Sequence, residues 1–67
     1  MEITFNNHPH QIEAKSSIQN ALDLWIGEKQ KGIAIAVNDA IVYKTQWANY
    51  ELQPNDNVLV ITAIQGG

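Results

Sequence analysis

The sequence predicts a two-layer α+β domain, in which one helix packs against one face of a β-sheet. Apolar residues recur at helical spacing over one segment, residues 18–26, where they form a single stripe. Several other short segments alternate apolar and polar residues, or are rich in β-branched residues, which is typical of strands. A chain of 67 residues holds one domain at most. The single helix must therefore bury its stripe against the sheet.

The N-terminal residues predict a β-hairpin. Ile3 and Phe5 alternate with polar neighbours over residues 2–6, which indicates a half-buried strand. The turn residues Asn6-Asn7-His8-Pro9 follow, and residues 10–14 predict a second short strand. The proline is expected at the start of that strand or at a sheet edge, because it has no N–H to donate to a neighbouring strand.

The helix is the best-defined element of the sequence. Ser16 or Ser17 is expected to cap it, and Ser16 with Gln19 matches the S-x-x-Q capping box. Trp25 lies on the apolar stripe and is expected in the core. The complete stripe consists of Ile18, Ala21, Leu22, Trp25 and Ile26.

Two uncharged segments in the second half predict buried strands. Residues 33–37 form a β-branched run, which indicates a strand buried on both faces. Asn38-Asp39 then predicts a tight turn, and residues 41–43 predict a short strand that pairs back. Residues 58–64 form the longest apolar run and predict a central strand that is also covered on both sides.

The segment between these strands carries two aromatic residues and a turn. One irregular turn within residues 45–50 is expected to place Trp47 over the core. Trp47 and Tyr50 could instead belong to an exposed interface, where aromatic residues are enriched. Gln53-Pro54-Asn55-Asp56 then predicts a turn, because proline suits its second position and asparagine tolerates a positive φ at the third.

The simplest closure of these elements places the first and last strands side by side and parallel at the sheet centre, which is the β-grasp arrangement. We expect a mixed sheet of four to five strands on one main helix. Residues 1–64 would form this domain, and residues 65–67 a flexible C-terminal tail. Leu22 and Ile61 are expected in its core.

The composition excludes several kinds of site and partner. Without cysteine, the chain has no disulfide, thiolate zinc site, iron–sulfur cluster, cysteine nucleophile or persulfide of its own. Four lysines and no arginine leave little charge to neutralise phosphates, so nucleic-acid and membrane binding are not expected. Charged residues make up only 16%, which leaves apolar surface for a protein partner. With no signal peptide and no spanning apolar run, a cytoplasmic location is expected.

A catalytic or metal site has little support in the sequence. His8 and His10 flank Pro9 without further convergent ligands, so both are expected to be exposed turn and edge-strand residues. Ser16, His10 and Asp23 could be drawn as a triad, but their spacing does not support one. The chain is therefore not expected to be an enzyme. The scattered acids are expected to be solvated turn formers: Asp39, Glu51 and Asp56.

The unusual feature is the C-terminal pair Gly66-Gly67. A Gly-Gly tail has no side chains, so it can thread into a narrow partner cleft and present only its α-carboxylate. A carboxylate at neutral pH is a poor electrophile, and it must be activated, typically as an acyl-adenylate, before a nucleophile can attack it. The alternative is a frayed terminus. A predicted β-grasp domain before the tail favours the functional interpretation, with Ile64 and Gln65 as candidate partner-binding residues by proximity.

An ordered set of residues along the whole chain carries a family resemblance: Leu22, Val37-Asn38, Ile41-Val42, Trp47, Leu52, Asp56 and Ala63-Ile64-Gln65-Gly66-Gly67. With this set the sequence resembles the ThiS family, bacterial sulfur carriers of thiamin biosynthesis with a ubiquitin-like β-grasp fold. Two positions depart from the family pattern. Tyr43 stands where the family often has proline, and Asn55 where it often has glycine, which affects local turn geometry more than function.

The resemblance implies a mechanism and partners. The E1-like adenylyltransferase ThiF would use ATP to convert the Gly67 carboxylate to an acyl-adenylate. Sulfur from a cysteine desulfurase would displace AMP and leave a thiocarboxylate, which thiazole synthase, ThiG, would use for the thiazole ring. ATP and magnesium would belong to the activating enzyme, and this chain would bind no cofactor stably. The alternatives are a carrier for molybdopterin or tRNA thiolation, and a β-grasp interaction module whose Gly-Gly is incidental.

Overall fold

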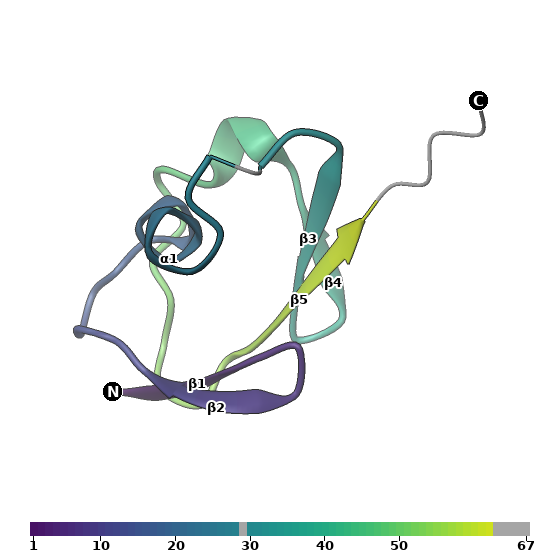
Figure 1. Ribbon diagram of the computed structural model, residues 1–67. Coiled ribbons are helices and arrows are strands. Elements are labelled where there is room, and N and C mark those ends of the chain that lie inside the picture. Colours follow the sequence, from purple (N-terminus) through teal and green to yellow (C-terminus); the bar gives the residue numbers. More distant parts are fainter. Residues whose placement is uncertain (29, 63–67) are drawn as a thin grey trace.

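The computed structural model describes residues 1–28 and 30–62. In these residues one helix lies on one face of a five-stranded sheet with the strand order β2-β1-β5-β3-β4 (Figure 1). This confirms the predicted α+β class with one main helix. The elements in chain order are β1 (Glu2–Phe5), β2 (His8–Gln11), α1 (Ile18–Trp25), β3 (Ile33–Val37), β4 (Ala40–Val42), the 3₁₀ helix η1 (Lys44–Gln46) and β5 (Asn57–Thr62).

The first and last strands form the centre of the sheet. β1 and β5 run parallel, with Thr4 opposite Asn57 and Phe5 opposite Val58. All other neighbouring strands are antiparallel. The predicted β-grasp closure is therefore confirmed. Over the described residues, no helix is long and apolar enough to cross a membrane.

The N-terminal hairpin turns two residues earlier than predicted. Asn6 and Asn7 both adopt positive φ angles, 50° and 68°, as a two-residue hairpin turn requires. β2 therefore begins at His8, and Pro9 lies within it opposite Thr4. The residue pair that flanks a two-residue turn is hydrogen-bonded, so the next pair is not, and Pro9 removes no ladder bond there. On its other side Thr4 donates its N–H to the Asp56 carbonyl at 2.9 Å.

The helix is capped by Ser17, and the predicted Ser16–Gln19 capping box is wrong. The Ser17 hydroxyl accepts the Asn20 N–H, and the Asn20 side chain accepts the Ser17 N–H, both at 3.1 Å. The Ser16 carbonyl accepts the Leu52 N–H at 2.8 Å, beside an isolated bridge between Ser17 and Glu51, and the first helical bond goes to the Ser17 carbonyl, from the Ala21 N–H at 3.1 Å. A contact distant in sequence thus moves the helix start by one residue.

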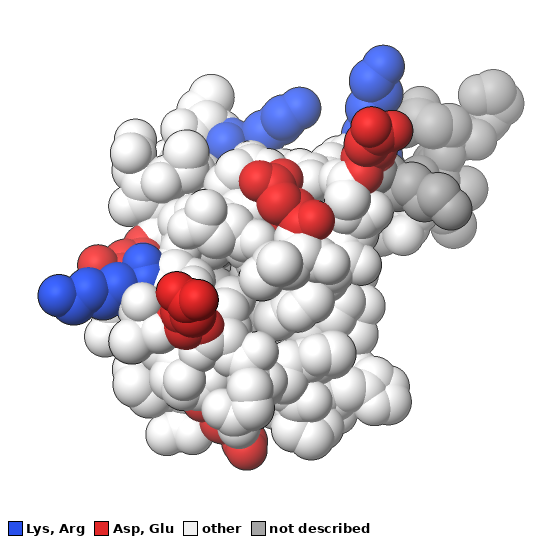
Figure 2. Space-filling model, turned by 60° about the vertical axis from the view of Figure 1, so that its left-hand side comes forward, with Lys and Arg blue, Asp and Glu red and all other residues white. Residues whose placement is uncertain are grey.

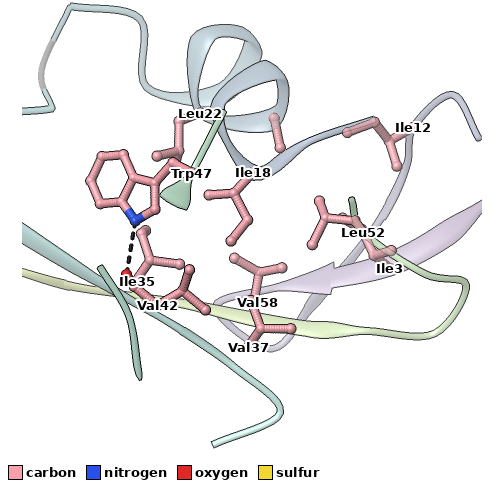
Figure 3. Packing of buried hydrophobic residues seen from close by; sticks show 11 residues of the cluster. Ile3, Ile12, Ile18, Leu22, Ile35, Val37, Val42, Trp47, Leu52 and Val58 are labelled. Atoms are coloured by element: carbon pink, nitrogen blue, oxygen red, sulfur yellow. Dashed lines mark hydrogen bonds between the residues drawn. The ribbon is translucent and has the colours of Figure 1, made fainter. Parts of the chain in front are cut away.

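The core lies between α1 and the face of the sheet that α1 covers. Figure 3 shows the helix side chains Ile18 and Leu22 pointing toward the sheet. Trp47 is 1% exposed and closes one end of this layer, as predicted. Its ring N–H donates to the Val42 carbonyl at 2.9 Å, which satisfies the only polar atom of the buried ring. The sheet residues that meet the helix are Ile3, Ile35, Val37, Val42 and Val58.

The prediction that β5 is covered on both sides is wrong. Val58 is buried, but Ile61 is 47% exposed, so Ile61 is not a core residue. The described part of β5 begins at Asn57 and runs to Thr62, and residues 63–64 of the predicted strand lie outside the described residues. The physical reason is that one eight-residue helix covers only one face of the sheet. In β3 the last three residues are buried, but Ile33 and Ala34 are half-buried, so double burial holds for only part of that strand.

Candidate functional site

The four residues predicted to form the functional end of the chain, Ile64, Gln65, Gly66 and Gly67, lie outside the described residues. The predicted boundary between domain and tail, at residues 64 and 65, lies outside them as well. The structure describes the strand that leads toward these residues, β5, and the sheet surface around it.

A hydrogen-bonded cluster holds the start of β5. The Asp56 carboxylate accepts the Asn38 side-chain amide at 3.0 Å and the Gln53 N–H at 2.8 Å. The Asn38 side-chain oxygen accepts the N–H of Asn57, the first residue of β5, at 2.9 Å. Asp56 is only 8% exposed, so its prediction as a solvated turn former is wrong. The cluster ties the β3–β4 turn to β5 and fixes where the last strand begins.

The other two loop acids match their prediction. Asp39 and Glu51 are exposed. Asp39 follows Asn38 in a two-residue turn in which both residues have positive φ, 71° and 51°. This is the tight turn expected between β3 and β4.

The face of the sheet that α1 leaves uncovered carries an apolar surface. Side chains alternate along strands, so residues that alternate with the core residues of β3, β4 and β5 point to this face. Ala36 lies opposite both Ile41 and Leu59, and Ala34 lies opposite Ile61. Ile41 is 52% and Ile61 47% exposed. These five residues, Ala34, Ala36, Ile41, Leu59 and Ile61, are called the open-face patch below.

The small residues of β3 decide the shape of the open-face patch. Ala36 is 5% exposed although it faces away from α1, because the larger Ile41 and Leu59 flank it on the adjacent strands. The larger side chains therefore stand on either side of a low strip of alanines. Beside this patch, Tyr43 follows β4 and is 70% exposed. Contiguous apolar surface of this kind is typical of protein–protein contact sites.

Charged groups do not dominate the described surface. Figure 2 shows one face of the molecule, on which the described lysine side chains stand apart from one another and do not form a basic patch. The formal net charge of the chain is −3. Both observations agree with a partner recognised through apolar contacts more than through charge.

His10 departs from its prediction as an exposed edge residue, whereas His8 is exposed as expected. The ring of His10 lies 5.8 Å from that of Phe5 and 5.1 Å from that of Trp25. His10 pairs with Ile3, which places it on the side of β2 that faces the helix. Trp25 ends the short helix and is half-buried, so it borders the core and does not fill it as predicted.

The residues of the hypothetical triad have other partners. The Ser16 hydroxyl donates to the Glu13 carbonyl at 2.7 Å. Asp23 accepts hydrogen bonds from the side chains of Gln30 and Gln19, both at 2.9 Å, and these two bonds lower the pKa of its carboxyl. His10 packs among aromatic rings, as described above. Across residues 1–28 and 30–62, no group of three or more His, Cys, Asp or Glu side chains could hold a metal ion.

Comparison with known proteins decides the family. The model of the ThiS family matches residues 3–67. This chain belongs to the ThiS family. It is 34% identical over 67 residues to the sulfur carrier protein ThiS of Escherichia coli strain K12, and the alignment covers 100% of both chains.

A solved structure of similar fold supports the architecture. The crystal structure of the thiamine biosynthesis protein ThiS from Geobacter metallireducens superposes with a TM-score of 0.88, and 100% of each chain is covered. Its sequence identity of 14% makes it a comparison of fold alone. The resemblance to the ThiS family and the β-grasp fold are both confirmed.

Sequence reasoning missed the open-face patch. The apolar runs of β3 and β5 suggest burial on both faces, and no local signal in either run distinguishes the covered face from the open one. The signal that could have revealed the patch is the number of helices. A chain with one amphipathic helix of eight residues can cover one face of a five-stranded sheet, so apolar residues on the other face must remain accessible.

Proposed function

We propose that this ThiS-family chain is a sulfur carrier for thiamin biosynthesis. In this proposal, an E1-like adenylyltransferase of the ThiF type activates the Gly67 carboxylate with ATP and releases pyrophosphate. The terminal sulfur of a partner's persulfide, which originates from a cysteine desulfurase, then displaces AMP and forms an acyl disulfide between Gly67 and that partner. A thiol reduces this disulfide, becomes oxidised itself and releases the chain with a thiocarboxylate at Gly67. Thiazole synthase, of the ThiG type, incorporates this sulfur into the thiazole ring.

One observation carries the proposal: the chain matches the curated sulfur carrier over the full length of both proteins. The family match extends through Gly66 and Gly67, which the proposed chemistry needs. The absence of cysteine agrees with it, because sulfur can then be carried only at a terminal carboxyl group and any persulfide must belong to a partner.

In this mechanism the chain is the substrate of each step, and its partners supply the catalytic groups. ATP and magnesium are held by the activating enzyme. The two glycines contribute by having no side chains, so that a narrow catalytic cleft can admit the carboxylate and exclude water.

The open-face patch is the docking surface in this proposal. It includes Leu59 and Ile61 of β5, the strand that leads toward Gly67. A partner that contacts the patch therefore lies beside the path to the reactive end. An apolar surface of modest size also suits a carrier that must leave one enzyme and bind the next.

Intact-mass spectrometry tests the activation. After incubation with the adenylyltransferase, ATP and a sulfur source, the mass of the chain should rise by the difference between one sulfur and one oxygen atom. A variant that lacks Gly67 should show no such rise. Gly66→Val should also remain unmodified, because a β-branched side chain at that position would block a narrow cleft. A wild-type chain that forms neither adenylate nor thiocarboxylate with an adenylyltransferase of proven activity would show the proposal to be wrong.

The recipient is tested separately. The thiocarboxylated chain should lose its sulfur to thiazole synthase in the presence of the other thiazole precursors. Transfer to the large subunit of molybdopterin synthase, with none to thiazole synthase, would retain the carrier mechanism but assign it to another pathway.

A further inference from the structure

β5 is paired on both sides over only part of its length. Its antiparallel pairing with β3 continues to Thr62, which lies opposite Ile33. Its parallel pairing with β1 ends where Phe5 lies opposite Val58, because the chain turns toward β2 at Asn6. Figure 1 shows the last part of β5 beside β3 and away from β1 and β2.

The side chain of Asn6 makes the last contact on the β1 side of β5. The Asn6 backbone N–H donates to the Val58 carbonyl at 2.9 Å, and the Val60 N–H donates to the Asn6 side-chain oxygen at 2.9 Å. The side-chain oxygen thus takes the place that the next backbone carbonyl of a longer β1 would occupy. Among the described residues, no strand pairs with this edge of β5 beyond that point.

The direction of the backbone groups follows from these bonds. In a parallel pair, alternate residues direct both their N–H and their C=O toward the same neighbour. The Val58 carbonyl and the Val60 N–H both point to the β1 side, so the Val60 carbonyl and the Thr62 N–H point to the same, unpaired edge. Asn57 points the other way, because its carbonyl accepts the Asn38 N–H on the β3 side at 2.9 Å.

The two outer edges of the sheet are protected in ways that this edge is not. β2 carries Pro9, which cannot donate a hydrogen bond to an added strand. β4 has only three residues, and Lys44 follows it closely. The described strand β5 has the sequence NVLVIT, without proline or charge. An open, uncharged strand edge is a template for pairing with another chain.

We propose that the edge of β5 formed by Val60 and Thr62 pairs with an extended segment of the enzyme that activates the C-terminus. This inference rests on the proposed function. The occupant follows from position: the edge directly precedes the residues that must enter the activating cleft, and it borders the open-face patch through Ile61. A paired strand would fix the direction of β5 and orient the residues that follow. Its apolar side chains on the open face would contact Leu59 and Ile61.

Thr62→Pro tests the pairing by removing one backbone N–H. The opposed pair of Thr62 and Ile33 is not hydrogen-bonded in this register, so the change removes no bond to β3. Ile61 already has the extended backbone that a residue before proline prefers. Thr62→Val is the matched control, since it keeps the N–H, the size and the β-branched shape.

We expect Thr62→Pro to raise the KM for this chain in the adenylation reaction about tenfold, because a partner carbonyl loses its donor and meets the proline ring. Thr62→Val should change it less than about twofold. Equal KM values for wild type and Thr62→Pro, with wild type adenylated normally, would overturn the edge pairing alone. A wild-type chain that is never adenylated would instead overturn the proposed function.

A measurement on the unmodified chain removes any dependence on the folding of the proline variant. Amide hydrogen exchange at Thr62 should be fast in the free protein and at least about tenfold slower with a saturating amount of the adenylyltransferase. Unchanged exchange at Thr62 in the bound state would overturn the proposal. Protection that arises without the enzyme, at high protein concentration, would assign the edge to a second copy of this chain and overturn it as well.

Discussion

Replacing Leu22 and Ile61 separately by alanine tests whether one face of the sheet is open. Both are large apolar residues in the middle of an apolar run or stripe, but Leu22 is 0% and Ile61 47% exposed. Leu22→Ala removes contacts from a side chain that is fully buried. Ile61→Ala removes contacts from a side chain that is only about half buried. The two substitutions should therefore differ clearly in their effect on the free energy of unfolding.

The expected magnitudes follow from burial. Leu22→Ala removes contacts and leaves a cavity, so it should lower the free energy of unfolding by about 2–5 kcal/mol. A domain of this length has about 3–10 kcal/mol in total, so this variant should be near the limit of stable folding. Full burial of an isoleucine contributes about 1.5–3 kcal/mol, and Ile61 realises about half of that. Ile61→Ala should cost about 1 kcal/mol, because water fills the vacated space.

Urea denaturation followed by far-UV circular dichroism measures both differences. Thermal unfolding gives a second measure, since about 1 kcal/mol corresponds to a shift of roughly 4–8 °C in Tm for a domain of this size. If Ile61→Ala destabilises the protein as much as Leu22→Ala, then β5 is covered on both faces in solution, and the reasoning from a single covering helix is wrong.

The same variant separates stability from docking. Ile61→Ala should reduce the efficiency of adenylation by the activating enzyme, although the protein stays folded at 25 °C. Leu24→Ala is the matched control, because Leu24 is a 73% exposed apolar residue on α1, outside the open-face patch. It should leave both stability and adenylation nearly unchanged. Equal adenylation of the wild type, Ile61→Ala and Leu24→Ala would exclude the open-face patch as the docking surface.

Substitutions at three further residues test individual contacts. Asn38→Ala should lower the free energy of unfolding by about 1–3 kcal/mol, because the buried Asp56 carboxylate loses a donor and alanine is strained at the positive φ. Asn38→Gly should lower the free energy of unfolding less, because glycine tolerates that φ. Equal losses for the two variants in a urea titration would contradict this. Hydrogen bonds, first of all from Gln30, lower the pKa of the Asp23 carboxyl below its ordinary value of 3.8. The ionised carboxylate therefore stabilises the fold at pH values above 3.8, and this stabilisation is lost as the pH falls through the lowered pKa of the folded protein. Gln30→Ala should raise that pKa toward its ordinary value in a carboxyl ¹³C NMR titration, and an unchanged titration curve would assign the shift elsewhere. Trp47→Phe should cost about 1–3 kcal/mol by circular dichroism, because a buried carbonyl loses its donor.

Local patterns predicted the elements whose causes are local. The helical stripe located α1 because the period of its apolar residues is a property of that segment alone. The Asn-Asp turn before β4 was predictable for the same reason, since both residues tolerate positive φ. The sequence offers Ser16 or Ser17 as the cap, and the structure selects Ser17. The expected capping box lies one residue too early, because the Ser16 carbonyl is bonded to the N–H of Leu52, a residue distant in sequence.

The N-terminal hairpin shows a similar limit. The sequence identifies its turn residues, but it also assigns Pro9 to the turn, which places the expected start of β2 two residues too late. The register made proline acceptable within the strand, because it placed Pro9 opposite Thr4 at a pair that exchanges no hydrogen bonds. Register is a relation between two strands, and the sequence of one strand does not contain it.

By itself, the sequence determined the fold class, the lack of any cysteine chemistry and the Gly-Gly end on which the proposed function depends. These follow from periodicity, composition and residue type, which are complete in the sequence. The parallel central strands were predicted as the simplest closure of these elements, and the structure confirms them. Only the tertiary structure decided that Asp56 is buried, that Ile61 faces outward and that, among the described residues, no strand pairs with the last part of one edge of β5. The physical reason is that burial and pairing depend on what lies across space from a residue, and one short helix and one short neighbouring strand leave part of the last strand uncovered.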